Sequence, residues 1–144
     1  MITVVKVASK KELDTVFHIR ETVFVKEQEV DPKEEYDEFE ETSIHFLAQV
    51  GNKPAGTARW RRTNKGIKLE RFAVLKPFRG QGVGQALVKA VLEDISARTD
   101  DEVNLLYLHA QVPAVPLYAK FGFEKEGELF MECNIAHYTM KKDL

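Results

Sequence analysis

The sequence predicts an α+β fold in which one mixed, mostly antiparallel central sheet of about seven strands carries four helices. Three observations point to it. Seven short segments show the alternation or the apolar runs of strands. Glycine-containing turns join neighbouring segments as hairpins. One strand–helix–strand crossover requires a parallel pair within the sheet. With 144 residues, the chain is expected to form a single domain over residues 1–144 with a substantial core.

A strand and a long helix are predicted at the start of the chain. The strand covers residues 2–7, and Ser9 then caps a helix with Glu12 as its capping-box partner. Apolar residues at helical spacing extend this helix over residues 10–26. Arg20 lies on the flank of the apolar face. We expect its stem to cover the core with its head in water, and contact with a substrate is the alternative.

The next segment, Glu27–Glu41, carries nine acidic residues. Asp31 followed by Pro32 is typical of a helix start, because proline fits the first helical position. Such an acidic run is usually a solvated surface. The alternative is an acidic wall that attracts a cationic amine.

Three antiparallel strands follow over residues 44–50, 54–62 and 67–74. The turns between them are Gly51–Lys53 and Thr63–Gly66.

The third of these strands leads into a glycine-rich turn and an amphipathic helix. Gly80, Gly82 and Gly84 remove side chains at alternate positions, so backbone N–H groups can approach a bulky ligand. The turn opens a helix N-terminus, where unpaired N–H groups and the helix dipole favour an anion such as phosphate. A tight turn without a ligand is the plainer alternative. Gln85 and Ala86 exclude a Walker loop, and no register supplies the third glycine of a dinucleotide fingerprint.

The remaining chain is predicted to add a buried strand, a short helix and a hairpin. Residues 103–110 are apolar enough for the middle of a sheet, and the crossover makes them parallel to the strand before the glycine turn. A helix begins near Pro113, because first-turn N–H groups need no partner, and Gly122 ends it. Residues 126–133 and 135–141 form the closing hairpin.

Composition limits the classes of function. Lys and Arg number 21 against 23 Asp and Glu, and this balance speaks against nucleic-acid binding. Cys133 is the single cysteine, so a disulfide within the chain and a cysteine zinc cluster are excluded, and the four histidines show no metal-ligand spacing. Because no apolar run approaches about 18 residues and the first residues lack signal-peptide anatomy, we expect a cytoplasmic protein without a membrane segment. Edge strands leave a homodimer as an open alternative.

Two motifs resemble those of the GNAT superfamily of acyl-CoA-dependent N-acyltransferases. The glycine turn, Arg79-x-x-Gly82-x-Gly84, resembles the R/Q-x-x-G-x-G/A signature. The later segment resembles the second family motif, with glutamine where asparagine is commoner, and reads Gln111-x-x-Ala114 followed by Leu117-Tyr118-x-Lys120-Phe121-Gly122-Phe123. The order of predicted strands and helices fits the same family over nearly the whole chain. The ElaA-like and YjcF-like branch is further resembled by two patterns, Arg20…Val23-Phe24…Glu27-Gln28 and Ile135-x-His137-x-x-Met140.

The resemblance implies a GNAT fold in which the fourth and fifth strands splay apart and acetyl-CoA enters between them. It further implies that the loop amides hold the pyrophosphate of coenzyme A, and that the pantetheine arm pairs with the fourth strand like an extra strand. The cofactor-binding residues that it implies are Phe72, Ala73, Val74, Arg79, Gly80, Gln81, Gly82, Val83, Gly84, Gln85, Gln111, Ala114 and Tyr118.

The implied reaction is acetyl transfer from acetyl-CoA to the primary amine of an unidentified small-molecule or protein acceptor, by direct attack in a ternary complex. By this resemblance, the Phe72 N–H stabilises the oxyanion and Tyr118 protonates the departing thiolate. A half-buried tyrosine with a satisfied hydroxyl is the alternative. Glu70 is a candidate base, because residues two apart on a strand share a face with the site near Phe72.

The sequence leaves alternative roles open for Glu70 and for the histidines. Glu70 is equally well explained as an ion-pair partner of Arg59, Arg61 or Arg71. His109 is an alternative base, whereas His18, His45 and His137 are expected in the core or on the surface. No metal is expected. Competing functions are a non-catalytic acyl-CoA sensor with the same fold and transfer of a longer acyl chain.

Overall fold

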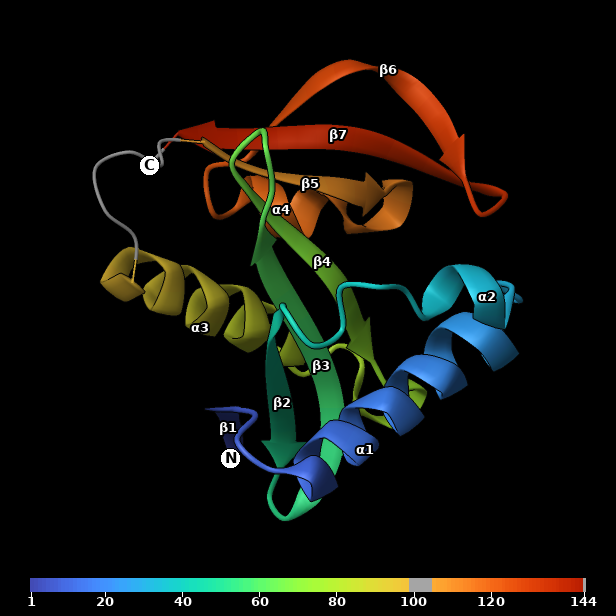
Figure 1. The fold of residues 1–144 in the computed structure, drawn as a ribbon, viewed down its shortest axis with the longest axis vertical. Coiled ribbons are helices and arrows are strands. Elements are labelled where there is room, and N and C mark those ends of the chain that lie inside the picture. The colour runs from blue at the N-terminus through green and yellow to red at the C-terminus, as the bar shows by residue number, and fades with distance from the viewer. Residues whose placement is uncertain (99–104, 144) are drawn as a thin grey trace.

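The computed structural model, which describes residues 1–98 and 105–143, contains a seven-stranded sheet with helices on both faces (Figure 1). The strand order is β1-β2-β3-β4-β5-β7-β6. Among the residues described, only β4 and β5 pair in parallel, and the other neighbours are antiparallel. The predicted mixed, mostly antiparallel sheet is therefore confirmed.

The strands are β1 (Ile2–Lys6), β2 (Ile44–Val50), β3 (Lys53–Arg62), β4 (Ile67–Val74), β5 (Leu105–Gln111), β6 (Glu124–Glu132) and β7 (Ile135–Asp143). The α-helices are α1 (Lys10–Arg20), α2 (Pro32–Glu35), α3 (Val83–Arg98) and α4 (Val115–Ala119). A π-helical segment, η1 (Glu21–Glu27), continues α1, and the short 3₁₀ turns are η2 (Lys76–Phe78) and η3 (Val112–Ala114).

Local sequence signals agree with these elements at most boundaries. The capping box of Ser9 and Glu12 is present, and Asp31 caps α2. Gly122 has φ +91° after α4, as a left-handed helix end requires. Both residues of the β6–β7 turn, Cys133 and Asn134, have positive φ, which is the geometry of a tight hairpin. The first two residues of the strand predicted over 103–110 lie outside the described residues.

Two predicted helices differ in detail. The helix predicted over residues 10–26 is α-helical only to Arg20 and then widens into η1, whose last turn is closed by Gln28 N–H bonding to the Val23 carbonyl. The helix predicted to begin near Pro113 starts instead as the 3₁₀ turn η3 and becomes α4 at Val115. Each proline then lies in a first turn, where its missing N–H costs nothing.

Two hydrophobic clusters hold the helices on opposite faces of the sheet. On one face, α3 buries Val83, Leu87, Val88, Val91 and Ile95 against the strands. On the other face, α1 and η1 bury Val16, Ile19, Val23 and Phe24 against Leu47 and Ala73. Within the described ranges, no helix is both long enough and apolar enough to cross a bilayer.

A buried ion-pair network joins α1 to the acidic segment, and it corrects the prediction for Arg20. The side chain is 0% exposed rather than capped by water. Its guanidinium donates to the Glu35 carboxylate at 3.1 Å and forms a bidentate pair with Glu40 at 2.7 and 2.8 Å. Glu40 also accepts from Arg59 at 2.8 Å, and Arg59 forms a second bidentate pair with Asp37.

The acidic segment is therefore neither a purely solvated surface nor a free anionic wall. Glu35 is buried, and Asp37 and Glu40 are partly buried, each against at least one arginine. Composition alone did not show this, because the neutralising arginines come from α1 and the sheet. Burial raises the pKa of Asp37, but the hydrogen bonds and charge of Arg59 outweigh it and lower that pKa to about 2.

The Asp37–Arg59 pair predicts an acid-dependent stability. Because the folded-state pKa of Asp37 lies below its unfolded value, the stabilisation is complete above about pH 4 and is lost as the pH falls toward about 2. Asp37→Asn should lower the free energy of unfolding by about 2 kcal/mol at pH 7. Its deficit relative to the parent should shrink as the pH is lowered to 3, as measured by urea unfolding.

Asp14→Asn is the matched control, because Asp14 is exposed and lies 3.9 Å from Lys10 in a surface pair. It should change the free energy of unfolding by less than about 0.5 kcal/mol. A deficit of Asp37→Asn that stays constant between pH 7 and pH 3 would contradict the assigned pairing.

Candidate active site

The sheet opens between β4 and β5, as the sequence resemblance implies. Within residues 1–98 and 105–143, these strands pair only at three positions, where residues 67–69 lie beside residues 106–108. Beyond Leu108, β5 continues its pairing with β7 as far as Gln111 opposite His137. A bulge at Arg71, whose φ is +58°, breaks the register with β3 at the same place. Within the described residues, β4 therefore presents residues 70–74 without a partner on its β5 side.

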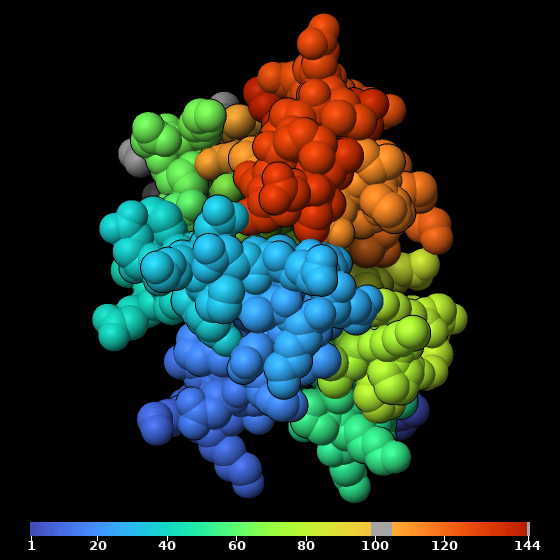
Figure 2. Space-filling view, turned by 90° about the vertical axis from the view of Figure 1, so that its right-hand side faces the viewer, coloured from blue at the N-terminus to red at the C-terminus, as the bar shows by residue number. Residues whose placement is uncertain are grey.

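A cavity of about 560 Å³ lies at this opening. It is lined by four parts of the chain: η1 with the segment after it, the β3–β4 pair, the β5–α4 connection and the β6–β7 turn. The lining residues are Phe24, Gln28, Val30, Glu34, Glu35, Asp37, Arg61, Lys68, Glu70, Arg71, Phe72, Gln111, Ala114, Tyr118, Glu132, Cys133, Ile135 and His137. In Figure 2 the blue segment of α1, η1 and α2 meets the red β6–β7 hairpin near the middle of the face of the molecule that is shown.

The glycine turn lies between β4 and α3, and its backbone is open to a ligand. Gly80 and Gly82 have φ values of +78° and +92°. A Cβ at Gly80 would meet nothing within 4 Å, and one at Gly82 would meet only the Ile2 side chain at 3.8 Å. Gly84 is different, because its Cβ would lie 3.2 Å from Leu117, so its missing side chain also serves the packing of α3 on α4.

Arg79 links this turn to the helical layer. Its guanidinium forms a bidentate pair with Glu27 at 2.6 and 2.8 Å, and its Nε donates to the Val74 carbonyl at 2.9 Å. The hydrogen bond from Arg79 lowers the pKa of Glu27. The side-chain charge of Arg79 is thus paired with Glu27, in an ion pair whose Arg79 side chain is 39% exposed.

Four further predicted cofactor-binding residues lie on β4, in the glycine turn and at the start of α3. Ala73 and Val83 are buried in the two cores, and Gln81 and Gln85 are exposed, with the Gln81 amide bonded to the Pro77 carbonyl. None of these side chains lines the cavity. Any contact that they make with a ligand there therefore depends on backbone groups.

Gln111 and Ala114 both border the cavity, at the end of β5 and in η3. The Gln111 side chain exchanges two hydrogen bonds with Gln28, at 2.9 and 3.3 Å. Gln28 was not among the predicted site residues. The amide pair joins the end of η1 to the end of β5, so it spans the two sides of the opening.

Phe72 and Tyr118 meet across the cavity from β4 and α4. Their rings pack edge to face with centroids 5.5 Å apart. Tyr118 is 6% exposed, and its burial raises the pKa of the phenol above the ordinary value. The hydroxyl therefore keeps its proton at neutral pH, as a proton donor must, although the raised pKa also makes it a weaker acid.

Glu70 takes part in a dense set of ion pairs. Arg61 contacts its carboxylate at 2.5 Å and Arg59 at 3.3 Å, and Lys68 and Arg71 lie within 4 Å. Burial raises the pKa of Glu70, but the charges of Arg59 and Lys68 and the Arg61 hydrogen bond outweigh it and lower that pKa. A lowered pKa weakens a general base, so these contacts favour the ion-pair alternative. The base role of Glu70 stays a prediction.

A second titratable group, Glu132 with His109 and His137, lies at the β6–β7 turn. Of its members, His109 was predicted as an alternative base, His137 was expected in the core or on the surface, and Glu132 was not predicted. His109 Nδ1 lies 3.1 Å from one oxygen of Glu132, and His137 Nε2 lies 3.7 Å from the other. Glu132 and His137 line the cavity, whereas His109 lies behind Glu132 on β5. Phe130 packs edge to face on His109 and stacks on His137.

The sequence held one signal for this group. Residues two apart on a strand point to the same face, so Ile135 and His137 share a face of β7. Which side chains of the neighbouring strands lie beside them on that face depends on the strand pairing, which local patterns do not show. In the parts of the chain that the structure describes, no three His, Cys, Asp or Glu side chains are arranged to hold a metal ion.

Comparison with known proteins gives a consistent result. Residues 5–144 match the family model described as an acetyltransferase (GNAT) domain. The chain is 42% identical over 136 residues to the uncharacterised N-acetyltransferase YjcF of Bacillus subtilis. This alignment covers 94% of the present chain and 95% of YjcF.

Solved structures agree with this match. Escherichia coli ElaA superposes with a TM-score of 0.86 at 26% identity, over 99% of both chains. A GNAT family acetyltransferase from Elizabethkingia anophelis shares the fold, with a TM-score of 0.71 at 18% identity over 99% of this chain and 98% of that chain. The sequence matches and the splayed sheet lead to the same assignment, and the chain belongs to the GNAT acetyltransferase family.

Proposed function

We propose that this protein transfers an acetyl group from acetyl-CoA to a primary amine by direct attack in a ternary complex. One observation carries the proposal: the unpaired edge of β4 borders a cavity in which Phe72 and Tyr118 face each other. An unpaired strand edge binds an extended, amide-containing arm by adding a strand. The pantetheine arm of coenzyme A has this chemistry.

The glycine turn fits the diphosphate end of the same ligand. The space where a side chain of Gly80 or Gly82 would stand is open, so a ligand can approach the backbone there, and the first amides of α3 have no partner within the helix. The solved relative from Elizabethkingia anophelis holds acetyl-CoA, which supports a donor of this class. When bound, this donor supplies an activated thioester. The protein supplies the amides of residues 79–85 and the β4 edge that orient it.

Two groups of the chain are assigned to the chemistry. The Phe72 N–H belongs to the unpaired part of β4 and is proposed to stabilise negative charge on the carbonyl oxygen under attack. The Tyr118 hydroxyl is buried and protonated at the same cavity, and it is proposed to protonate the leaving thiolate. The acceptor enters from the side lined by η1, α2 and the β6–β7 turn.

Replacement of Tyr118 tests the transfer step. Tyr118→Phe removes one hydroxyl and keeps the ring contact with Phe72, so we expect kcat to fall about 100-fold with unchanged coenzyme A affinity. Free-thiol release with a panel of primary amines measures kcat, and calorimetry measures affinity.

Tyr138→Phe is the matched control, because Tyr138 lies on β7, does not line the cavity, and makes a cation–π contact with Lys125 through its ring. It should keep the parental rate. Equal turnover by Tyr118→Phe and the parent would refute the acid role. A parent that binds coenzyme A but releases no thiol with any amine would be a sensor rather than a transferase.

A second test addresses the glycine turn. Gly82→Val places a branched side chain where the donor's diphosphate is proposed to lie, so coenzyme A affinity should fall at least about tenfold. Gly51→Val is the control, because Gly51 also has positive φ and open space around it but lies in the β2–β3 turn. Both variants carry a similar backbone strain. Equal coenzyme A affinities of the two folded variants would remove the phosphate site from this turn.

A further inference from the structure

We propose that the ammonium group of the acceptor binds between Glu132 and His137, and that His137 Nε2 removes its proton. This assignment deepens the proposed function and rests on it for the reaction. The binding position rests on contacts of the β6–β7 hairpin alone.

The tautomer of His137 follows from its backbone contact. His137 Nδ1 lies 2.7 Å from the Ile135 carbonyl oxygen. A carbonyl oxygen only accepts, so Nδ1 carries the hydrogen. In the neutral ring, Nε2 then has the free lone pair, and the residue lines the cavity. His137 is 5% exposed and its ring stacks on Phe130, so its orientation is held by packing.

The charge and orientation of Glu132 are set from the other side. His109 contacts one carboxylate oxygen at 3.1 Å, and this hydrogen bond lowers the pKa of Glu132 against the effect of burial. The charged and titratable groups that face Glu132 are His109 on β5, His137 on β7, Lys68 on β4 and Cys133 in the β6–β7 turn. Glu132 is therefore ionised at neutral pH, and its second oxygen is turned toward His137.

These two atoms leave a place for a donor. Glu132 Oε2 and His137 Nε2 are 3.7 Å apart, which is too far for a direct hydrogen bond, and with neutral His137 both are acceptors. A primary ammonium has three N–H donors and can bond to both atoms at ordinary lengths. A group with N–H donors and a positive charge is thus the ligand that this pair selects.

Among the other carboxylates that line the cavity, Glu35, Asp37 and Glu70 are each paired with arginine. Glu34 also lines the cavity, from the exposed surface of α2. Glu132 has imidazole partners instead, so its negative charge is less fully compensated. It lines the same cavity as Phe72 and Tyr118, which places a bound amine on the side facing the proposed acyl donor.

The acceptor nitrogen loses two protons during the transfer. One ammonium proton moves to His137 Nε2 and then to water, which leaves a nucleophilic amine held by Glu132. The amine nitrogen forms a bond to the acetyl carbonyl carbon, and the carbon–sulfur bond breaks. Tyr118 gives its proton to the thiolate. The second proton lost by nitrogen restores the phenol, so the products are the amide, the free thiol and one proton released to water.

Kinetics of two variants test both halves of the assignment, with the best substrate of the amine panel. Glu132→Gln should raise the KM for the amine about tenfold or more, because a hydrogen bond to a charged group is lost. His137→Asn should lower kcat about 100-fold at neutral pH. That loss should shrink as the pH rises, since solution then supplies the free amine. Coenzyme A affinity should stay unchanged in both.

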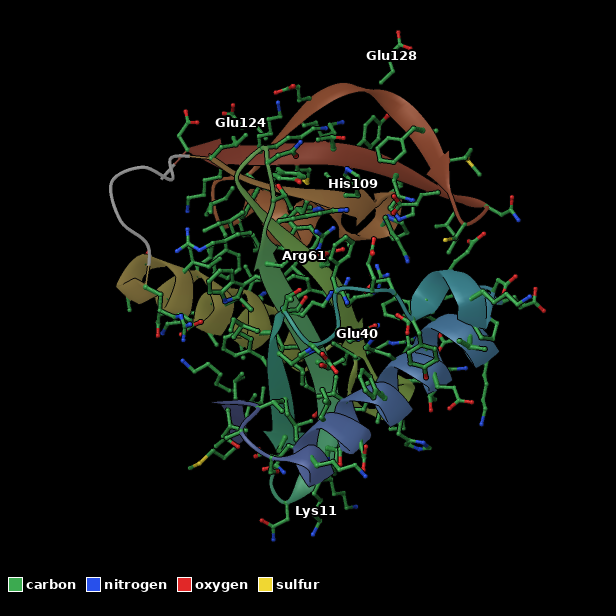
Figure 3. All side chains as sticks on the ribbon, viewed as in Figure 1. Lys11, Glu40, Arg61, His109, Glu124 and Glu128 are labelled. Atoms are coloured by element: carbon green, nitrogen blue, oxygen red, sulfur yellow. The ribbon has the colours of Figure 1, made fainter. Side chains whose placement is uncertain are left out.

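The controls are Glu128→Gln and His18→Gln. Both residues are exposed. In Figure 3, Glu128 projects from β6 away from the molecule, whereas His109, the partner of Glu132, lies below β7 in this view. Each control should keep the parental KM and kcat. Glu132→Gln and His137→Asn variants as active as these controls, in an active parent, would overturn the assignment and leave the proposed function standing.

A measurement without acyl donor tests the ammonium-binding position separately from the transferase activity. Nitrogen NMR of the histidine rings should show His137 as the Nδ1–H tautomer, and methylammonium should shift its Nε2 resonance but not those of His18. The Glu132→Gln variant should weaken this response. A parental His137 that does not respond to methylammonium overturns the binding position. A response in a parent that acetylates no amine keeps the position and refutes the transferase.

Discussion

The interruption of pairing between β4 and β5 is the constraint on which the rest of the site depends. Residues 70–74 of β4 leave backbone groups without a partner on the β5 side, because β4 bulges at Arg71 while β5 continues along β7 on its other edge. Buried backbone groups without partners cost about 1–3 kcal/mol each, so such an edge is stable only beside water or an extended ligand. The core on both faces of the sheet holds the strands in this arrangement.

Electrostatics assign different tasks to the two sides of the cavity. Arg20 and Arg59 neutralise Glu35, Asp37 and Glu40, and thereby fasten the acidic segment beside the opening. A buried pair of this kind adds little net stability, but loss of one partner is costly. Three of the nine acidic residues of this segment, Glu35, Asp37 and Glu40, therefore have a structural role. The carboxylate that we propose for a cationic acceptor is Glu132, which lies at the hairpin and has histidine partners.

Sequence patterns predicted the parts of the molecule that local forces determine. Strands β2 and β4, the capping box of α1 and the left-handed Gly122 follow from alternation, capping and φ preferences. The burial of Arg20 was missed because its partners lie 15 and 20 residues away on another segment. The contact of Glu132 with His109 was missed for the same reason, since it arises from the sheet order. Gly84 shows a third case, in which a motif residue also has a packing role.

The two proposed halves of the site differ in how they are built. The donor side consists of β4, the glycine turn and α3, whose side chains are part of the main core, so changes there disturb the fold. The acceptor side consists of an edge hairpin and a segment held by ion pairs, in which side chains can change without loss of core packing. On this proposal, a shared acyl donor and differing acceptors follow from one architecture. The amine specificity of this chain then depends chiefly on Glu132, His137 and their neighbours at the β6–β7 turn.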